Sequence, residues 1–167
     1  MCIKHKYATI MANYFTEGTK KMSTIKEYLS NDHVKCDQLF AAMEDAASNS
    51  LAEAKELAQE FVKATEHHFQ MEERVMFAEF EQKTGMTQGP TAVMRQEHTQ
   101  MRALMQQILE AIDADDKNKF FGLTETLMIL LQQHNMKEEQ MLYPMAQQHL
   151  MAESDRIVEM MDSLIVE

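Results

Sequence analysis

Two copies of one histidine pattern stand in this sequence, and their spacing constrains the fold more than any other feature. In each copy a first histidine precedes a second histidine by 35 or 36 residues. A glutamate then stands four residues after the second histidine. The local strings agree as well, since His68-Phe-Gln-Met-Glu-Glu73 resembles His134-Asn-Met-Lys-Glu-Glu139. A spacing of four places both side chains on one face of a helix, so the repeat predicts two similar helical hairpins. Its members are His33, His68, Glu72, His98, His134 and Glu138.

Turn-forming residues are few, and they divide the chain into long blocks. The 167 residues include only 4 Gly and 2 Pro, whereas helix formers such as Ala, Leu, Met and Glu are frequent. Ser30, Ser50 and Pro90 suit helix starts, and Pro144 is expected to kink or end the last long helix. Apolar residues recur at intervals of three and four within each block, as on the buried face of a helix. The expected long helices run over 31–47, 51–83, 91–112 and 117–142.

Four long helices joined by short turns predict an all-α fold, namely an up-down-up-down four-helix bundle with short extra helices at the N- and C-termini. The extra helices are expected near 7–15, 25–29 and 155–165, and the last is expected to pack against the outside of the bundle. The predicted domains are an N-terminal segment over 1–23, the bundle over 24–150 and a C-terminal helix over 151–167.

Helical phase places the six repeat members on the apolar stripes that face a bundle core. His33, for example, shares its face with Leu29 and Phe40, and His98 shares its face with Met105. Ionisable side chains in a core are costly unless something binds them. The plain alternative is that each histidine is hydrogen-bonded on its own or lies at the surface of an irregular bundle.

A metal site accounts for all six side chains together. A His and a Glu one turn apart on a helix can bind the same ion, and carboxylates on two facing helices can bridge two ions. Without metal, we expect burial to raise the pKa values of the glutamates and to lower those of the histidines. His67 falls on a polar face and is not included in the site.

Motifs for other chemistries are missing from the sequence. No His has a Glu three residues before it, which ferritin-like di-metal proteins require. There is no His-Glu-x-x-His, no Gly-rich phosphate loop and no Cys-x-x-Cys. Cys36 lies one turn from His33, but a small core residue is the simpler interpretation. The 17 Met are spread over every expected helix, which favours flexible core filling over a copper site.

Charge and hydropathy limit the expected partners and location. A net charge of −11 argues against nucleic-acid binding, which needs a basic surface. No stretch approaches the roughly 18 apolar residues of a membrane span, and no signal peptide is recognisable. Two Cys and many Met suit a reducing compartment. We therefore expect a cytoplasmic protein with neither a nucleic-acid nor a membrane partner.

The histidine pattern resembles the hemerythrin-like (HHE cation-binding) family. The resemblance covers about residues 24–146 and includes the strings Glu27-Tyr28-Leu29, Asp32-His33 and Glu138-Glu139-Gln-Met-Leu-Tyr-Pro144. It implies a four-helix bundle that holds a non-haem di-iron centre bridged by the two carboxylates.

The four-His, two-Glu set differs from that of oxygen-carrying hemerythrins, which have five His. Arg102 stands four residues after His98, where the carriers have the additional His. The set is more similar to the di-iron iron–sulfur-repair proteins and the iron-sensing hemerythrin domains. Cys2 has no second Cys beside it, so we do not expect the double-Cys N-terminal domain that many repair proteins have.

The number of ligand atoms indicates what such a centre does. Four imidazole nitrogens and two bridging carboxylates supply about eight donor atoms, whereas two six-coordinate ions need about twelve. A shared oxo or hydroxo bridge takes two positions and leaves about one open position on each ion. O2, NO or peroxide is expected to bind there. Mixed nitrogen and oxygen ligation suits iron or manganese and accepts zinc, so the expectation of two irons per chain rests on the resemblance.

The expected function is therefore the binding of O2, NO or a related oxidant in sensing, detoxification or iron–sulfur repair, and whether the chain is an enzyme stays open. One alternative is a reversible O2 carrier or storage protein, against which the missing fifth His weighs. Another is an iron-responsive interaction module, in which metal binding folds the bundle and displays a surface.

Overall fold

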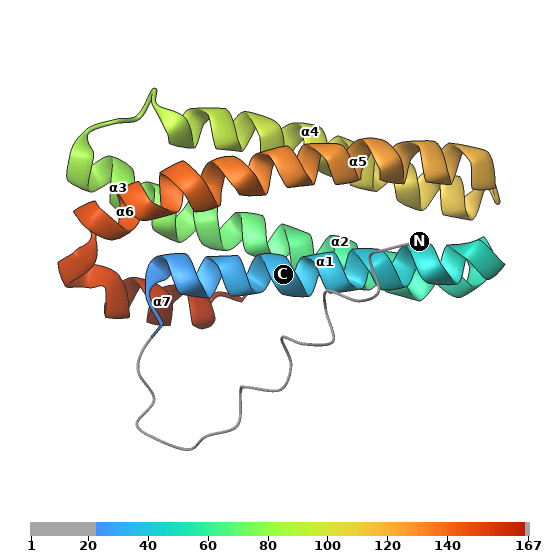
Figure 1. Ribbon diagram of the computed structural model, residues 1–167, viewed down its shortest axis with the longest axis horizontal. Helices are drawn as coiled ribbons and strands as arrows, with labels where there is room; N and C mark the ends of the chain where they lie inside the picture. The colour runs from blue at the N-terminus through green and yellow to red at the C-terminus, as the bar shows by residue number, and fades with distance from the viewer. Residues whose placement is uncertain (1–22, 166–167) are drawn as a thin grey trace, which may run out of the picture.

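The computed structural model describes residues 23–165 (Figure 1). The described part consists of helices and turns and contains no strand, so the all-α prediction is confirmed. The helix expected near 7–15 lies outside the described residues. Within residues 23–165, no helix combines the length and the apolar character that crossing a membrane requires. The long helices are α1 (Ile25–Asn49), α2 (Leu51–Met71), α4 (Pro90–Asp113) and α5 (Lys117–Lys137).

Two of the long helices continue through a short π-helical segment into a further helix. Each of these segments begins at one of the two glutamates of the repeat. A π-helical turn is wider than an α-helical one and is often found at a functional site. The segments are η2 (Glu72–Met76), which leads from α2 into α3 (Phe77–Thr84), and η3 (Glu138–Leu142), which leads from α5 into α6 (Tyr143–His149).

Helix α1 begins earlier than predicted and is continuous. The sequence predicts separate helices over 25–29 and 31–47 with Ser30 as the N-cap, and this prediction is wrong. Thr24 is the N-cap: its hydroxyl oxygen accepts from the backbone N–H of Glu27 at 3.1 Å, and the Glu27 carboxylate accepts from the N–H of Thr24 at 3.0 Å. This capping box satisfies the first backbone donors, so the helix does not need to begin again at Ser30.

Pro144 does not end the fourth helix, as one form of the prediction had it, because the helical path continues to His149. The N–H of Tyr143 donates to the carbonyl of Glu138, five residues back, which widens the turn just before the proline. Pro144 then stands in the first turn of α6. The missing N–H of a proline costs little at that position.

The other predicted helix ends are confirmed within a few residues. Ser50 alone separates α1 from α2, and its side chain accepts from the N–H of Glu53. Gly85 ends α3 with a φ of 74°, a left-handed conformation that glycine adopts without strain. Pro90 is the first residue of α4.

The helices form a bundle whose interior consists of two apolar clusters. α1 packs against α2 and α5, and α4 packs against α2 and α5 (Figure 1). One cluster, around Phe61 and Ile108, fills the half of the bundle that contains the α1–α2 turn. The other, around Phe80 and Tyr143, fills the opposite half, where α7 (Ser154–Asp162) buries Ile157 against it. The six repeat residues lie between these two clusters.

Candidate metal centre

The six repeat side chains converge in the middle of the bundle, and each exposes 4% or less of its surface. They form two overlapping groups, and the possible ligand atoms of each group lie within 4.8 Å of one another. Ligands at about 2.0–2.2 Å from one ion have this spread. We call His33 and His68 the His33 half, and His98 and His134 the His98 half.

The two glutamates lie between the halves and contact both. Glu72 Oε2 is 3.2 Å from His98 Nε2 and 3.6 Å from His68 Nε2. Glu138 places Oε1 at 3.2 Å from His134 Nε2 and Oε2 at 3.3 Å from His33 Nε2. Each carboxylate therefore lies within 3.6 Å of an imidazole nitrogen from either half.

Every histidine of the cluster is held from outside by a carboxylate. The outer ring nitrogens, Nδ1, lie 2.7–3.1 Å from a carboxylate oxygen in all four cases. When Nδ1–H donates outward, the Nε2 lone pair faces inward, which is the tautomer that a metal ligand needs. The pairs are His33 with Glu139, His68 with Asp32, His98 with Glu73 and His134 with Glu97.

Each of these outer carboxylates is the sequence neighbour of another member of the cluster. Asp32 precedes His33 and holds His68, so it joins α1 to α2. Glu73 follows Glu72 and holds His98, so it joins η2 to α4. The second copy of the repeat does the same with Glu97 and Glu139. The sequence analysis did not identify this role. The signal was visible, because an acidic residue stands directly before the first His and directly after the Glu in each copy of the repeat.

Cations support three of the four outer carboxylates. Lys35 pairs with Asp32 at 3.1 Å, Arg102 pairs with Glu73 at 2.8 Å, and Lys137 pairs with Glu97. Arg102 also binds Glu66 and lies 5.3 Å from the centre of the Phe69 ring. Arg102, which stands where oxygen carriers have a fifth His, therefore makes these contacts and supplies no ligand atom.

Charge pairing within the site decides its protonation. Burial lowers the pKa of His33, but hydrogen bonds to Glu138 and Glu139 outweigh burial and raise that pKa to about 10. Burial and the hydrogen bonds to Glu72 and Glu73 compete in the same way at His98 and leave its pKa raised, at about 9. Burial raises the pKa of Glu138, yet its histidine partners hold that pKa well below the usual range. The expectation that burial favours the neutral forms is wrong for these three residues.

Two buried carboxylate oxygens show that the donors present fit a metal. Glu72 Oε2 and Glu138 Oε1 have no hydrogen-bond partner, although each lies 3.2 Å from an imidazole Nε2. The Nε2 atoms of His98 and His134 are only 3.1 Å apart. Imidazole and carboxylate groups crowded in this way are costly in a protein interior, and a bound cation relieves the cost.

Tyr143 is a member of the cluster that the sequence analysis did not identify. Its side chain is fully buried, and its hydroxyl lies 2.6 Å from Glu72 Oε1 and 3.0 Å from Glu138 Oε2. The same oxygen is 3.1 Å from His33 Nε2 and 3.5 Å from His68 Nε2. Burial and the nearby charges of Glu138 and Glu72 raise the pKa of Tyr143 well above its usual value. The phenol is therefore a neutral donor in the metal-free site.

Residues left out of the proposed site lie apart from it. His67 is half-buried, and its Nε2 donates to the carbonyl of Leu164 at 3.1 Å. His149 contacts the ring of Phe80. Cys36 is buried as a free thiol, and burial together with the charge of Asp32 raises its pKa to about 12. These observations agree with the prediction that Cys36 is a core residue.

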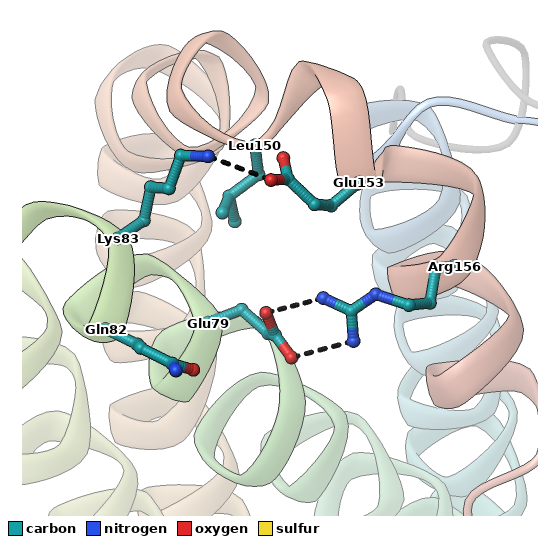
Figure 2. Close-up of a pocket in the computed structure, with 6 residues that line it drawn as sticks. All are labelled: Glu79, Gln82, Lys83, Leu150, Glu153 and Arg156. Carbon is teal, nitrogen blue, oxygen red and sulfur yellow. Dashed lines mark hydrogen bonds and ion pairs between the residues drawn. The ribbon is translucent and has the colours of Figure 1, made fainter.

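A surface hollow of about 560 Å³ lies away from the cluster, between α3 and the start of α7 (Figure 2). Its charged side chains are paired across it: Lys83 with Glu153 at 2.8 Å, and Arg156 with Glu79 at 2.7 Å. These pairs tie the C-terminal helix to α3. The hollow contains none of the repeat residues.

Comparison with known proteins identifies the family. The model of the hemerythrin HHE cation binding domain matches residues 24–146, which include all six repeat residues. The chain belongs to this family. Neither a curated protein nor a solved structure matches it. Membership implies a metal-binding site in this hemerythrin-like protein, and the buried His and Glu cluster is a set of side chains that could hold a metal.

Proposed function

We propose that this hemerythrin-like protein holds two iron ions and binds O2, NO or a related oxidant at them. The observation that carries the proposal is the pair of donor groups that share Glu138, with Glu72 Oε2 also 3.6 Å from His68 Nε2 and with two carboxylate oxygens left unpartnered. The proposed ligands are His33, His68, Glu72, His98, His134 and Glu138. Manganese or zinc also suits these atoms, and iron is preferred because of the family.

The surrounding residues prepare the site for this chemistry. The outer carboxylates fix each imidazole ring and its tautomer, so little reorganisation is needed when metal binds. The two apolar clusters on either side keep bulk water out. Iron, when bound, supplies the electrons and the open positions at which a small oxidant reacts.

The proposal includes three finer expectations. The up-down-up-down order of the long helices is supported by the single-residue turn at Ser50 and the short turn over 114–116. A cytoplasmic location is supported by the free Cys36 thiol and by the need for a reducing supply of ferrous iron. The partner is a small diatomic molecule or peroxide, because the net charge of −11 disfavours nucleic acid.

Arg102 favours irreversible chemistry over reversible oxygen carriage. Its guanidinium is held by Glu66 and Glu73, so it cannot supply the additional imidazole that the carriers have at this place. The proposed output is therefore sensing, detoxification or iron–sulfur repair.

Anaerobic reconstitution with ferrous iron, followed by exposure to air or NO, tests the proposal. We expect about two irons per chain and new visible absorption after exposure. A double variant, Glu72→Gln with Glu138→Gln, is the matched control, because it keeps the side-chain volumes and removes both charged bridges. Metal content well below two, together with no visible absorption, would contradict the proposal. Absorption that reverses under vacuum over many cycles would replace it with oxygen carriage.

A further inference from the structure

The aromatic residues that follow the two repeat glutamates differ by one oxygen atom. Tyr143 and Phe77 occupy equivalent places, because each stands five residues after a repeat glutamate and directly follows a π-helical segment. The Tyr143 ring lies 5.6 Å from the His33 ring at an interplanar angle of 27°. The Phe77 ring lies 5.9 Å from the His98 ring at 14°. The repeat therefore places an aromatic ring against each half, and only one of the two rings carries a hydroxyl.

The hydroxyl of Tyr143 is surrounded by ligand atoms at distances typical of one coordination shell. Two adjacent ligands of an octahedral ion with bonds of about 2.1 Å are separated by about 3.0 Å. The Tyr143 oxygen lies 2.6, 3.0, 3.1 and 3.5 Å from atoms of Glu72, Glu138, His33 and His68, respectively. It has four such neighbours, which is the number adjacent to any one position of an octahedron.

We propose that Tyr143 is a further metal ligand, through its phenol oxygen, and that it closes the His33 half to exogenous molecules. The inference rests on the proposed two-metal site. The phenol proton passes to solvent as the ion binds, in the way that a coordinating thiol loses its proton. The protein then supplies about nine donor atoms instead of eight, which leaves about one open position in the whole site.

The remaining open position belongs to the His98 half, where the neighbouring rings have no donor. Phe69 stacks on His98 at 3.9 Å, and Phe77 lies on the same imidazole. An open metal position with these apolar neighbours suits a small uncharged molecule such as O2 or NO. The oxidant is thus expected to bind to one ion only.

The test compares ferric wild-type protein with Tyr143→Phe, with azide as the probe of open positions. Wild type should bind about one azide per chain and the variant about two, while both retain about two irons. A ferric ion bound to a phenolate oxygen absorbs visible light through charge transfer, so the variant should also lose a visible band. Tyr28→Phe is the control, since the Tyr28 hydroxyl donates to Asp162 at 3.2 Å and Tyr28 is not a member of the His and Glu cluster.

Two further measurements keep the inference falsifiable if Tyr143→Phe does not fold. Resonance Raman excitation of the unmodified ferric protein should enhance phenolate ring vibrations. Phe77→Tyr should lower azide binding, because it adds a hydroxyl to the open half. Wild type with about two irons, no phenolate vibrations and an azide count unchanged by Tyr143→Phe would overturn the role of Tyr143 alone. Wild type that binds no iron pair would overturn the proposed function itself.

Discussion

The His33 half and the His98 half of the site share a ligand pattern but differ in what surrounds it. Each half has two inward-facing imidazoles and access to both glutamates. The His33 half has the Tyr143 hydroxyl, and the His98 half has the bare rings of Phe77 and Phe69. A repeated sequence has thus produced similar ligands in two chemically unequal places.

The outer carboxylates make a second difference between the halves. In the His98 half, Arg102 holds Glu73 and Lys137 holds Glu97. In the His33 half, Glu139 is 41% exposed, and no Lys or Arg of the described residues pairs with it. Ion pairs restrict both outer carboxylates of the His98 half but only Asp32, through Lys35, in the His33 half, so we expect the imidazoles of the His98 half to be held more firmly. The predictions below use these differences.

The largest effect is expected from Glu72→Ala or Glu138→Ala, which should test whether the halves act as one site. Each carboxylate contacts both halves, so either change should abolish the spectrum of a coupled metal pair and reduce the iron content well below two per chain. Iron analysis and the visible spectrum measure this. If either variant still shows the spectrum of a coupled metal pair, or loses the ion of one half only, the two glutamates do not both bridge the halves.

Removing metal from both halves should lower the thermal midpoint by about 10 °C. A metal present at a thousand times its dissociation constant stabilises the folded state by roughly 4 kcal/mol, and 1 kcal/mol shifts the midpoint of a domain this size by about 2–4 °C. Thermal melts before and after chelation, with metal loss confirmed, measure the shift. An unchanged midpoint would mean that these residues do not form a core metal site.

Substituting an outer carboxylate should weaken the His98 half more than the His33 half. Glu73→Gln removes a charge that Arg102 and His98 share, and loss of such a partner typically costs about 10–100-fold in metal affinity. Glu139→Gln should cost less, because Glu139 is partly exposed and lacks a cation. Competition with a chelator measures both affinities. Equal losses would show that the ion pairs do not distinguish the halves.

Much of this arrangement was predictable from the sequence, because spacing alone determines which side chains share a helix face. His33, His68, Glu72, His98, His134 and Glu138 come together as the repeat predicts. Tyr143 was not predictable, since its position depends on the π-helical turn after Glu138, and that turn forms in the packed bundle. The same turn explains why the helical path continues past Pro144. The start of α1 could have been predicted, because Thr24 and Glu27 have the spacing of a capping box in the sequence.

The metal-free protein should lose stability as the pH rises above neutral, and both halves should contribute to the loss. The pKa of His98 is about 9 and that of His33 about 10, both above the ordinary value of 6.5. A raised folded-state pKa contributes stability that is present below about pH 6.5 and is lost as the pH rises through the folded value. Thermal melts of chelated protein between pH 6 and 10 measure this. His98→Gln and His33→Gln should each reduce this loss, and a stability that does not change with pH in the chelated wild type would contradict the raised pKa values.

The smallest effect is expected from His67→Ala and His149→Ala, which should leave both halves intact. Their rings contact Leu164 and Phe80, outside the cluster. Iron content and spectrum should match those of the wild type. If His67→Ala abolished metal binding while His68→Ala did not, the helical register of the site would be wrong by one residue.

The most direct test of the central claim is the number of ferrous ions that the chain binds in an anaerobic titration. We predict about two per chain for the wild type and less than about one for the double variant Glu72→Gln, Glu138→Gln, because the shared carboxylates hold both ions. The Tyr28→Phe variant should bind as the wild type does. A wild-type count below one, or a count that the double substitution leaves unchanged, would contradict the account.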